Sequence, residues 1–176
     1  MNGPRLPRNR NFSVRRVRAD EPALLRKLRL RALDESPAAF GSTSARERAF
    51  TDAIWVERTQ RGAQAHDTAT FVVERGGRMV GMVVVAVEAR VPSRAELFGV
   101  WVDPEVRGAG AGLALTEAAA SWAQGIGMSE LRLWVVATNP AALALYLRAG
   151  FVLTGAHQSM PRDPSVLEVE MVKPLD

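Results

Sequence analysis

Cysteine is absent from the 176 residues of this chain. The absence excludes disulfide bridges, thiolate zinc sites and a cysteine nucleophile. A protein of this composition that transfers an acyl group must pass it directly to the acceptor or through another residue. Only two histidines occur, His66 and His157, both in segments expected to be loops. Without cysteines or a nearby carboxylate pair they do not indicate a metal site, so we expect no metal.

Long hydrophobic runs are missing as well. No stretch of eighteen apolar residues occurs, so we expect no transmembrane helix and no membrane partner. Residues 1–11 are rich in Pro, Arg and Asn and lack the apolar segment of a secretory signal. We therefore expect a flexible N-terminal tail over residues 1–11, a single domain over residues 12–176, and a cytoplasmic protein.

Lysine is scarce: the 23 basic residues include only Lys27 and Lys173, and the rest are arginines. With the abundant alanine, this bias is typical of a GC-rich bacterial genome. The net charge of +4 is spread along the chain, and no basic stripe with interleaved aromatic residues occurs. We expect no nucleic-acid partner. A modest positive field does favour an anionic cofactor.

Apolar periodicity predicts the secondary structure. Strands are expected over residues 12–18, 69–74, 79–87, 95–102, 131–136, 151–156 and 166–172. Helices are expected from Asp20 to Pro37, from a capping box at Ser44–Glu47 to about residue 60, over 112–126, and over 139–149. The continuous run 131–136 predicts a strand buried on both faces, and the last strand alternates with Leu167, Val169 and Met171 inward. This order predicts a mixed α/β sheet flanked by helices, with parallel strands near 97–102 and 131–136.

The most informative segment is the strand that ends at Val102 and runs into a glycine-rich turn before a helix. Gly108, Gly110 and Gly112 lie in that turn. Such a turn presents backbone N–H groups at the positive end of a helix dipole, where phosphates bind. Glycines allow the phosphates to reach the backbone. The turn predicts a binding site for the diphosphate of a nucleotide-containing cofactor; the alternative is an ordinary strand-to-helix turn.

Two familiar phosphate loops fit this turn poorly. The ATP/GTP loop requires Gly-Lys-Ser/Thr, whereas Leu113 and Ala114 follow Gly112. The dinucleotide fingerprint requires Gly-x-Gly-x-x-Gly and an acid that ends the next strand, whereas Glu130 precedes that strand. An ATP- or NAD-binding protein is therefore the weakest of the three function classes considered.

The pattern Arg-x-x-Gly-x-Gly, formed by Arg107, Gly110 and Gly112, resembles the acetyl-CoA pyrophosphate loop of the GNAT (Gcn5-related N-acetyltransferase) superfamily. Asn139 and Tyr146 follow at the family's spacing, and the element order extends the resemblance over roughly residues 12–173. The resemblance implies a mostly antiparallel sheet of about seven strands, four flanking helices and a splayed pair of central parallel strands. Homodimers are common in such folds.

The resemblance also implies a cofactor site for acetyl-CoA. Its pantetheine arm is expected to pair with exposed backbone groups of Val100, Trp101 and Val102. Its diphosphate is expected on the turn, at Arg107, Gly108, Ala109, Gly110, Ala111, Gly112 and Leu113. Asn139 and Tyr146, two helical turns apart, are expected to complete the site. Asn139 also has the simpler role of a helix cap, Tyr146 that of a core aromatic, and Arg107 that of a solvated arginine.

Acetyl transfer from a thioester to an amine needs three groups. The backbone N–H of Val102 can stabilise the negative charge on the carbonyl oxygen. Tyr146, with a pKa near ~10, can protonate the leaving thiolate, whose pKa is near ~8.5. Glu96 is the candidate base, at a spacing that resembles the histone-acetylating branch of the superfamily. The alternative for Glu96 is a salt bridge to Arg94 or Arg132.

The sequence therefore predicts an N-acetyltransferase that transfers acetyl directly from acetyl-CoA to a primary amine of a small molecule or peptide. The alternative is a non-catalytic acyl-CoA-binding module of the same fold. The acceptor pocket is expected between the first two helices, the segment Phe40–Thr43 and the loop over 157–164, with Trp55 on its border. The identity of the amine is left open.

Overall fold

The computed structural model describes residues 11–91 and 93–175, which form one seven-stranded sheet. In chain order the strands are β1 (Ser13–Arg16), β2 (Thr68–Arg75), β3 (Arg78–Val87), β4 (Arg94–Val102), β5 (Glu130–Val136), β6 (Val152–Met160) and β7 (Asp163–Pro174). Their spatial order is β1-β2-β3-β4-β5-β7-β6, and β4–β5 is the parallel pair among antiparallel neighbours. The predicted mixed sheet is thus confirmed. Apart from Asn11, the predicted tail lies outside the described residues.

The helices number five in the described residues, not the four expected. They are α1 (Pro22–Glu35), α2 (Ser44–Arg48), α3 (Asp52–Gln64), α4 (Ala111–Gly125) and α5 (Pro140–Arg148), with 3₁₀ turns at Pro37–Ala39 and Pro104–Val106. The single helix predicted from Ser44 is divided because Thr51 adopts an extended conformation and starts a new helix, with Asp52 favourably placed in its first turn. The N-cap residues also differ by one: Thr43 caps α2 and Glu21 occupies the N-cap of α1.

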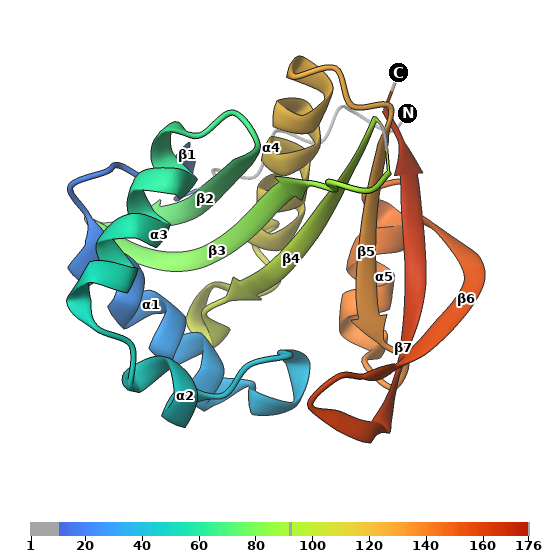
Figure 1. Cartoon of the computed structure of the whole chain (residues 1–176), viewed down its shortest axis with the longest axis horizontal. Helices are drawn as coiled ribbons and strands as arrows, with labels where there is room; N and C mark the ends of the chain where they lie inside the picture. Colours follow the sequence, from blue (N-terminus) through green and yellow to red (C-terminus); the bar gives the residue numbers. More distant parts are fainter. Residues whose placement is uncertain (1–10, 92, 176) are drawn as a thin grey trace, which may run out of the picture.

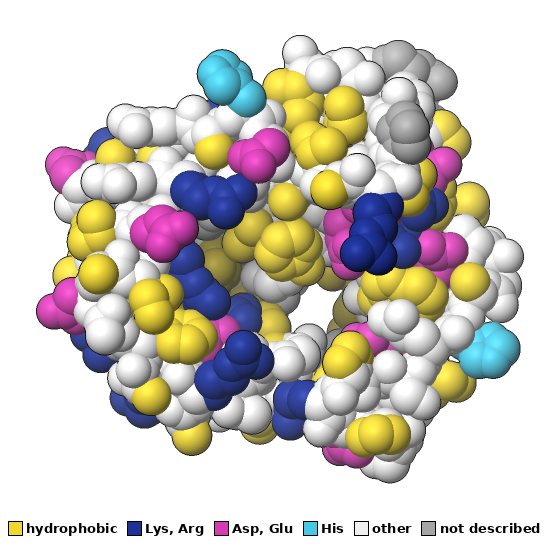
Figure 2. All heavy atoms as spheres, in the orientation of Figure 1, with side chains coloured by type: hydrophobic (Ala, Val, Ile, Leu, Met, Phe, Trp, Pro, Cys, Tyr) yellow, Lys and Arg dark blue, Asp and Glu magenta, His cyan; other side chains and the backbone are white. Residues whose placement is uncertain are grey.

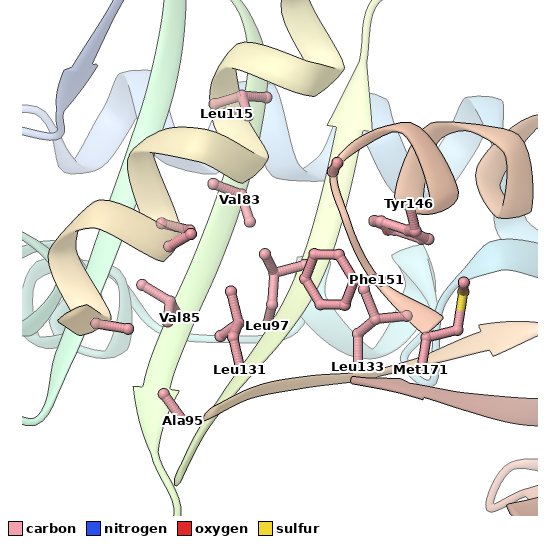
Figure 3. Close-up of a cluster of buried hydrophobic side chains, with 14 of the residues drawn as sticks. Val83, Val85, Ala95, Leu97, Leu115, Leu131, Leu133, Tyr146, Phe151 and Met171 are labelled. Atoms are coloured by element: carbon pink, nitrogen blue, oxygen red, sulfur yellow. The ribbon is translucent and has the colours of Figure 1, made fainter. Parts of the chain in front are cut away.

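The helices cover the two faces of the sheet. Helix α4 packs on β2, β3 and β4, and α5 lies beside it, while α1 and α3 cover the opposite face of β2 and β3 (Figure 1). Side chains of β3 alternate between these layers, as the period of a strand requires. Val83 and Val85 belong to the core under α4, together with Leu115 (Figure 3). Met82 belongs to the core under α1. None of the helices in the described ranges is long and apolar enough to cross a membrane.

Three expectations for the C-terminal half are wrong. Strand β5 is buried on one face only, because Trp134 and Val136 on its other face line a cavity. Leu167, expected inward, is 48% exposed, since the outer part of the β6–β7 hairpin runs past the covering helices (Figure 1). His157 lies in β6 rather than in a loop, and the segment 157–164 is part of that hairpin. No cluster of metal-ligating side chains is found among the residues described.

Candidate functional site

Strands β4 and β5 diverge in the middle of the sheet. Their parallel pairing covers three residues and ends at Glu96, whose partner is Arg132. Beyond this point the facing edges of the two strands have no strand between them, as Figure 1 shows. A cavity of about 760 Å³ opens there and is visible as a hollow in the molecular surface (Figure 2). The divergence expected of the central pair is present, and the cavity beside it is lined by residues 96–100 of β4.

A bulge in β4 shapes one wall of this cavity. Val84 faces Phe98 and Met82 faces Trp101, so Val83 alone opposes both Gly99 and Val100. Gly99 has a φ of +65°, a conformation that suits glycine. The bulge bends the strand away from the regular ladder at the point where the pairing with β5 has just ended.

The backbone of Val102 points into the gap. The N–H of Asp103 donates to the carbonyl of Val80 on β3 at 2.8 Å. Because successive residues of a strand direct their backbone groups to opposite edges, those of Val102 point away from β3 and those of Trp101 point toward it. Val102 is therefore the residue of this pair that presents an N–H to the gap, while the Trp101 side chain is buried under α1.

The glycine-rich turn follows directly and begins α4. Gly108 and Gly110 have φ values of +77° and +91°, and Gly110 is the N-cap of α4 without any side-chain cap. The backbone N–H groups of the first helical turn have no acceptor within the helix. The turn therefore presents free donors at the positive end of a helix dipole, the arrangement that binds phosphate.

Gly112 is a glycine for a different reason. A Cβ at Gly108 or Gly110 would meet no atom within 4 Å, whereas a Cβ at Gly112 would lie 3.1 Å from Cδ2 of Leu145 on α5. Gly112 thus permits close packing of α4 on α5, and the other two permit the left-handed backbone of the turn. The turn and α5 are held together by this contact.

Ion pairs fasten the turn to α1. Nη2 of Arg107 lies 2.6 Å from Glu35, and its Nε donates to the carbonyl of Val102 at 2.9 Å. Glu35 also accepts a hydrogen bond from Trp101, and the buried Asp103 pairs with Arg31 at 2.7 Å. The hydrogen bond from Arg107 lowers the pKa of Glu35 to about 2, against the opposing effect of burial. Arg107 is therefore not a freely solvated side chain, and sequence reasoning missed its partner.

Helix α5 places two predicted residues in the cavity wall. Asn139 caps the helix through a 3.1 Å bond from the N–H of Ala142, so the expected cap is confirmed. Tyr146 lies two turns later, is 7% exposed and packs edge-on against Phe151 at 5.8 Å. Both Asn139 and Tyr146 line the cavity, together with Val100 and Glu96. Burial raises the pKa of Tyr146, so the phenol keeps its proton throughout the neutral range.

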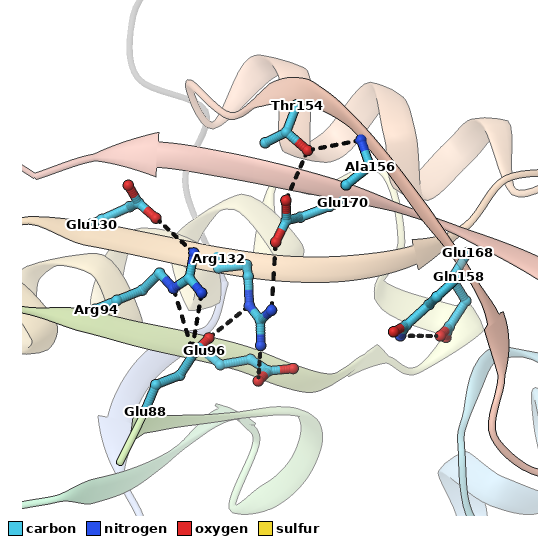
Figure 4. Close-up of polar contacts among 10 residues, drawn as sticks. All are labelled: Glu88, Arg94, Glu96, Glu130, Arg132, Thr154, Ala156, Gln158, Glu168 and Glu170. Carbon is cyan, nitrogen blue, oxygen red and sulfur yellow. Dashed lines mark hydrogen bonds and ion pairs between the residues drawn. The ribbon is translucent and has the colours of Figure 1, made fainter. Parts of the chain in front are cut away.

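Glu96 belongs to a charged network on the floor of the gap (Figure 4). It accepts a 2.8 Å hydrogen bond from Arg132, which also pairs with Glu88 and Glu170. The salt bridge considered from the sequence therefore exists and uses Arg132; Arg94 pairs with Glu88 and Glu130 instead. The Glu96 side chain is nevertheless 31% exposed and lines the cavity. The ion pair holds it at the base of the splayed strands.

Helices α1 to α3 supply a second group of charges, which sequence reasoning missed. Glu47 is buried, not a capping-box partner, and it pairs with Arg29 at 2.9 Å and with Arg58 at 3.3 Å. Burial raises the pKa of Glu47, but the hydrogen bonds and charge of Arg29, with smaller help from Ser42 and Arg58, outweigh burial and lower it. Trp55 lines the same cavity, as expected, and so do Phe40, Gly41 and Ser42.

Comparison with known proteins agrees with this geometry. The acetyltransferase (GNAT) family profile matches residues 28–151. A mycothiol acetyltransferase from Salinispora arenicola is 32% identical over 164 residues, which is 90% of this chain and 50% of the relative. A ribosomal protein bS18 alanine N-acetyltransferase from Escherichia coli is 34% identical over 97 residues, which is 55% of this chain and 64% of the relative.

Solved structures share the fold. A GNAT-family acetyltransferase from Streptococcus pneumoniae superposes with a TM-score of 0.80 at 23% identity, covering 94% of this chain and 99% of that one. The structure of yncA from Salmonella typhimurium with its cofactor acetyl-CoA has a TM-score of 0.75 at 19% identity, covering 94% of each chain. The chain spans about half the length of the mycothiol acetyltransferases that it matches. The family profile covers well over half of the residues, and the chain therefore belongs to the GNAT acetyltransferase family.

Proposed function

We propose that the protein is an acetyl-CoA-dependent N-acetyltransferase that transfers acetyl directly to a primary amine. One observation supports this above the others: β4 and Tyr146 line the same cavity, and β4 leads into the glycine-rich turn, which contacts at Gly112 the helix α5 that carries Tyr146. A site suited to a diphosphate therefore lies next to the helix that carries a possible proton donor. The family's relation to acetyl-CoA agrees with the assignment.

The backbone holds the cofactor in this proposal. The N–H groups of residues 108–113 bind the diphosphate, and the free edge of β4 at Val100 and Val102 pairs with the pantetheine arm. The N–H of Arg107, expected to join them, donates to the carbonyl of Pro104 instead. Asn139 borders the same path. Trp101, expected to take part, does not, because its backbone groups point toward β3 and its side chain is buried under α1. The Val102 N–H stabilises the negative charge that develops on the thioester oxygen during attack. No metal is assigned a role.

Two side chains donate and accept the protons of the reaction. Tyr146 donates a proton to the leaving thiolate; its raised pKa makes it a weak acid, so it donates only as that thiolate develops. Glu96 accepts a proton from the incoming ammonium, directly or through water. Arg132 keeps Glu96 oriented at the base of the gap.

The decisive experiment follows the release of CoA from acetyl-CoA across a panel of primary amines, with mass spectrometry of the products. Acetylation of at least one amine, dependent on the intact site, supports the proposal. Tight binding of acetyl-CoA in thermal-shift assays without transfer to any amine would instead favour a non-catalytic acyl-CoA-binding module.

A further inference from the structure

The cavity has two walls of opposite charge. Four arginines line it from α1, α2 and α3, namely Arg29, Arg46, Arg58 and Arg61, against the two carboxylates Glu47 and Asp67 on the same side. On the other side Glu96 and Glu168 line it. Figure 2 shows dark-blue side chains gathered along the helical rim of the hollow. An ammonium group is attracted to one wall and an anion to the other.

The arginine wall is rigidly built around Glu47. The guanidinium of Arg29 pairs with Glu47 and stacks over Phe40, with Cζ 4.7 Å from the ring centroid. The guanidinium of Arg58 pairs with the same carboxylate and stacks over Phe50 at 4.6 Å. Two guanidinium groups thus share one buried carboxylate, so the group of three carries a net positive charge. The ion pairs and ring contacts fix the positions of both guanidinium groups before any ligand binds.

Donors of this wall remain available. Arg29 bonds Glu47 through Nε and Nη2, whereas its Nη1 lies beside the bulge, 3.5 Å from where a Cβ of Gly99 would stand. Arg46 forms no ion pair with any residue of the described ranges, and it lines the cavity. The indole N–H of Trp55, in the same wall, is buried without an acceptor in the described part of the chain. A surplus of fixed donors around a concave site is the arrangement that binds a carboxylate.

We propose that Arg29 and Arg58 bind a carboxylate of the acceptor, so that the amine to be acetylated belongs to an amino acid or a similarly zwitterionic small molecule. The proposal rests on the function proposed above. The carboxylate lies against the arginine wall beside the bulge, and the amine points across the gap toward Glu96 and Tyr146. Glu47 is a positioning residue, since it orients both guanidinium groups. Polyamines, which carry no carboxylate, leave this wall unpaired.

The test compares each amino acid with its own carboxamide, and both with spermidine, by the rate of CoA release. For the wild-type enzyme, kcat/KM for the preferred amino acid exceeds that for its amide by about tenfold or more, because unpaired donors penalise the amide. Arg58→Gln, at a partly exposed position, lowers kcat/KM for the amino acid by about tenfold and leaves the amide unchanged. Arg29→Lys gives the same selective loss. A general loss of structure would lower both rates together.

Arg26→Gln is the matched control, because Arg26 lies on α1 and pairs with the exposed Asp52 outside the cavity. It leaves both rates unchanged. Equal rates for acid and amide, or a preference for spermidine, would overturn the carboxylate assignment and leave the N-acetyltransferase intact. Failure to acetylate any member of the panel would overturn the proposed function itself, and with it this inference.

Discussion

The two halves of the cavity are built by different means. On the side of β4, α4 and α5, backbone groups and helix termini form the site: a bulge at Gly99, a turn with two left-handed glycines, and a capped short helix. On the side of α1, α2 and α3, paired side chains form it, with Glu47 holding two arginines. The first construction suits a cofactor shared by a whole family, and the second suits an acceptor that differs between its members.

Ion pairs join the two halves, in addition to the packing of Trp101 under α1. The ion pairs Arg107–Glu35 and Arg31–Asp103 join the turn to α1. They position the cofactor side against the acceptor side without contributing to either binding surface in the cavity. A change on one side is therefore expected to alter one substrate and spare the other, which makes the comparison testable by mutation.

The largest effect is expected from Tyr146→Phe. Loss of the hydroxyl removes the proposed proton donor, and kcat falls by about 10²–10⁴-fold. The ring still packs on Phe151, so the midpoint of thermal unfolding and the Kd for acetyl-CoA stay near their wild-type values. Single-turnover rates and calorimetric titration measure the two quantities. An unchanged kcat would show that the phenol is only a core aromatic.

The next largest effect on activity is expected from Glu96→Gln. The amide cannot accept the proton of the ammonium group, and kcat/KM for the amine falls by about 10–100-fold near neutral pH. Glu88→Gln is the matched control: Glu88 also pairs with Arg132 but is not among the residues that line the cavity. Rate profiles over pH for both variants measure the difference. Equal losses in the two would mean that the network acts through structure alone.

Much of the local structure around β4, α4 and α5 could be predicted from sequence because its signals are local, whereas the cofactor site proposed there stays a prediction. Gly108, Gly110 and Asn139 act on backbone within a few positions of themselves, so spacing alone identifies them. The partners of Glu47 and Arg107 could not be predicted in this way. Arg29 lies 18 positions from Glu47, and Glu35 lies 72 positions from Arg107. Only the tertiary fold brings such charges together, and a capping-box pattern at Ser44–Glu47 suggested a different role.

The same limit explains the error over β5. An apolar run such as 131–136 is typical of a strand covered on both faces. In this fold one face packs in the core, while Trp134 and Val136 face the cavity. Apolar cavity walls and apolar cores have the same composition, so the apolar residues of the run do not distinguish them. Arg132 within the run is the residue that signals the difference, because it carries the charged network at the floor of the gap.

Glu47→Gln tests the acceptor side. The substitution leaves Arg29 and Arg58 without their shared charge, and the free energy of unfolding falls by about 2–3 kcal/mol. That is less than for a fully buried pair, because Arg58 is 46% exposed. KM for the amine rises, while the Kd for acetyl-CoA is unchanged. Glu57→Gln, at an exposed position of α3, is the control. A weaker affinity for acetyl-CoA would contradict the independence of the two halves.

Gly110→Ala and Gly112→Ala test separately the left-handed turn and the packing of α4 on α5. Keeping a φ of +91° at Gly110 costs alanine about 1–2 kcal/mol, so the free turn is expected to relax. Restoring the turn on binding then lowers the affinity for acetyl-CoA by up to about tenfold. Alanine at Gly112 comes too close only to the flexible end of Leu145, with Val102 at an ordinary contact distance, and the effect is about threefold or less. Calorimetric Kd values compare the two. Equal losses would show that the left-handed turn does not determine binding.

The smallest effect, on thermal stability, is expected from the ion pair between Arg107 and Glu35 that joins the two halves. Because Arg107 lowers the pKa of Glu35 to about 2, their interaction stabilises the folded protein at pH values above the ordinary glutamate range, near ~4.3, and is lost as the pH falls toward 2. Thermal unfolding of wild-type protein and Glu35→Gln should therefore differ most above about pH 5 and converge at lower pH. Glu105→Gln, exposed on the same turn, serves as the control. A difference that stays constant down to the lowest pH would mean that Glu35 stabilises the turn through packing, and that charge does not couple α1 to the cofactor side.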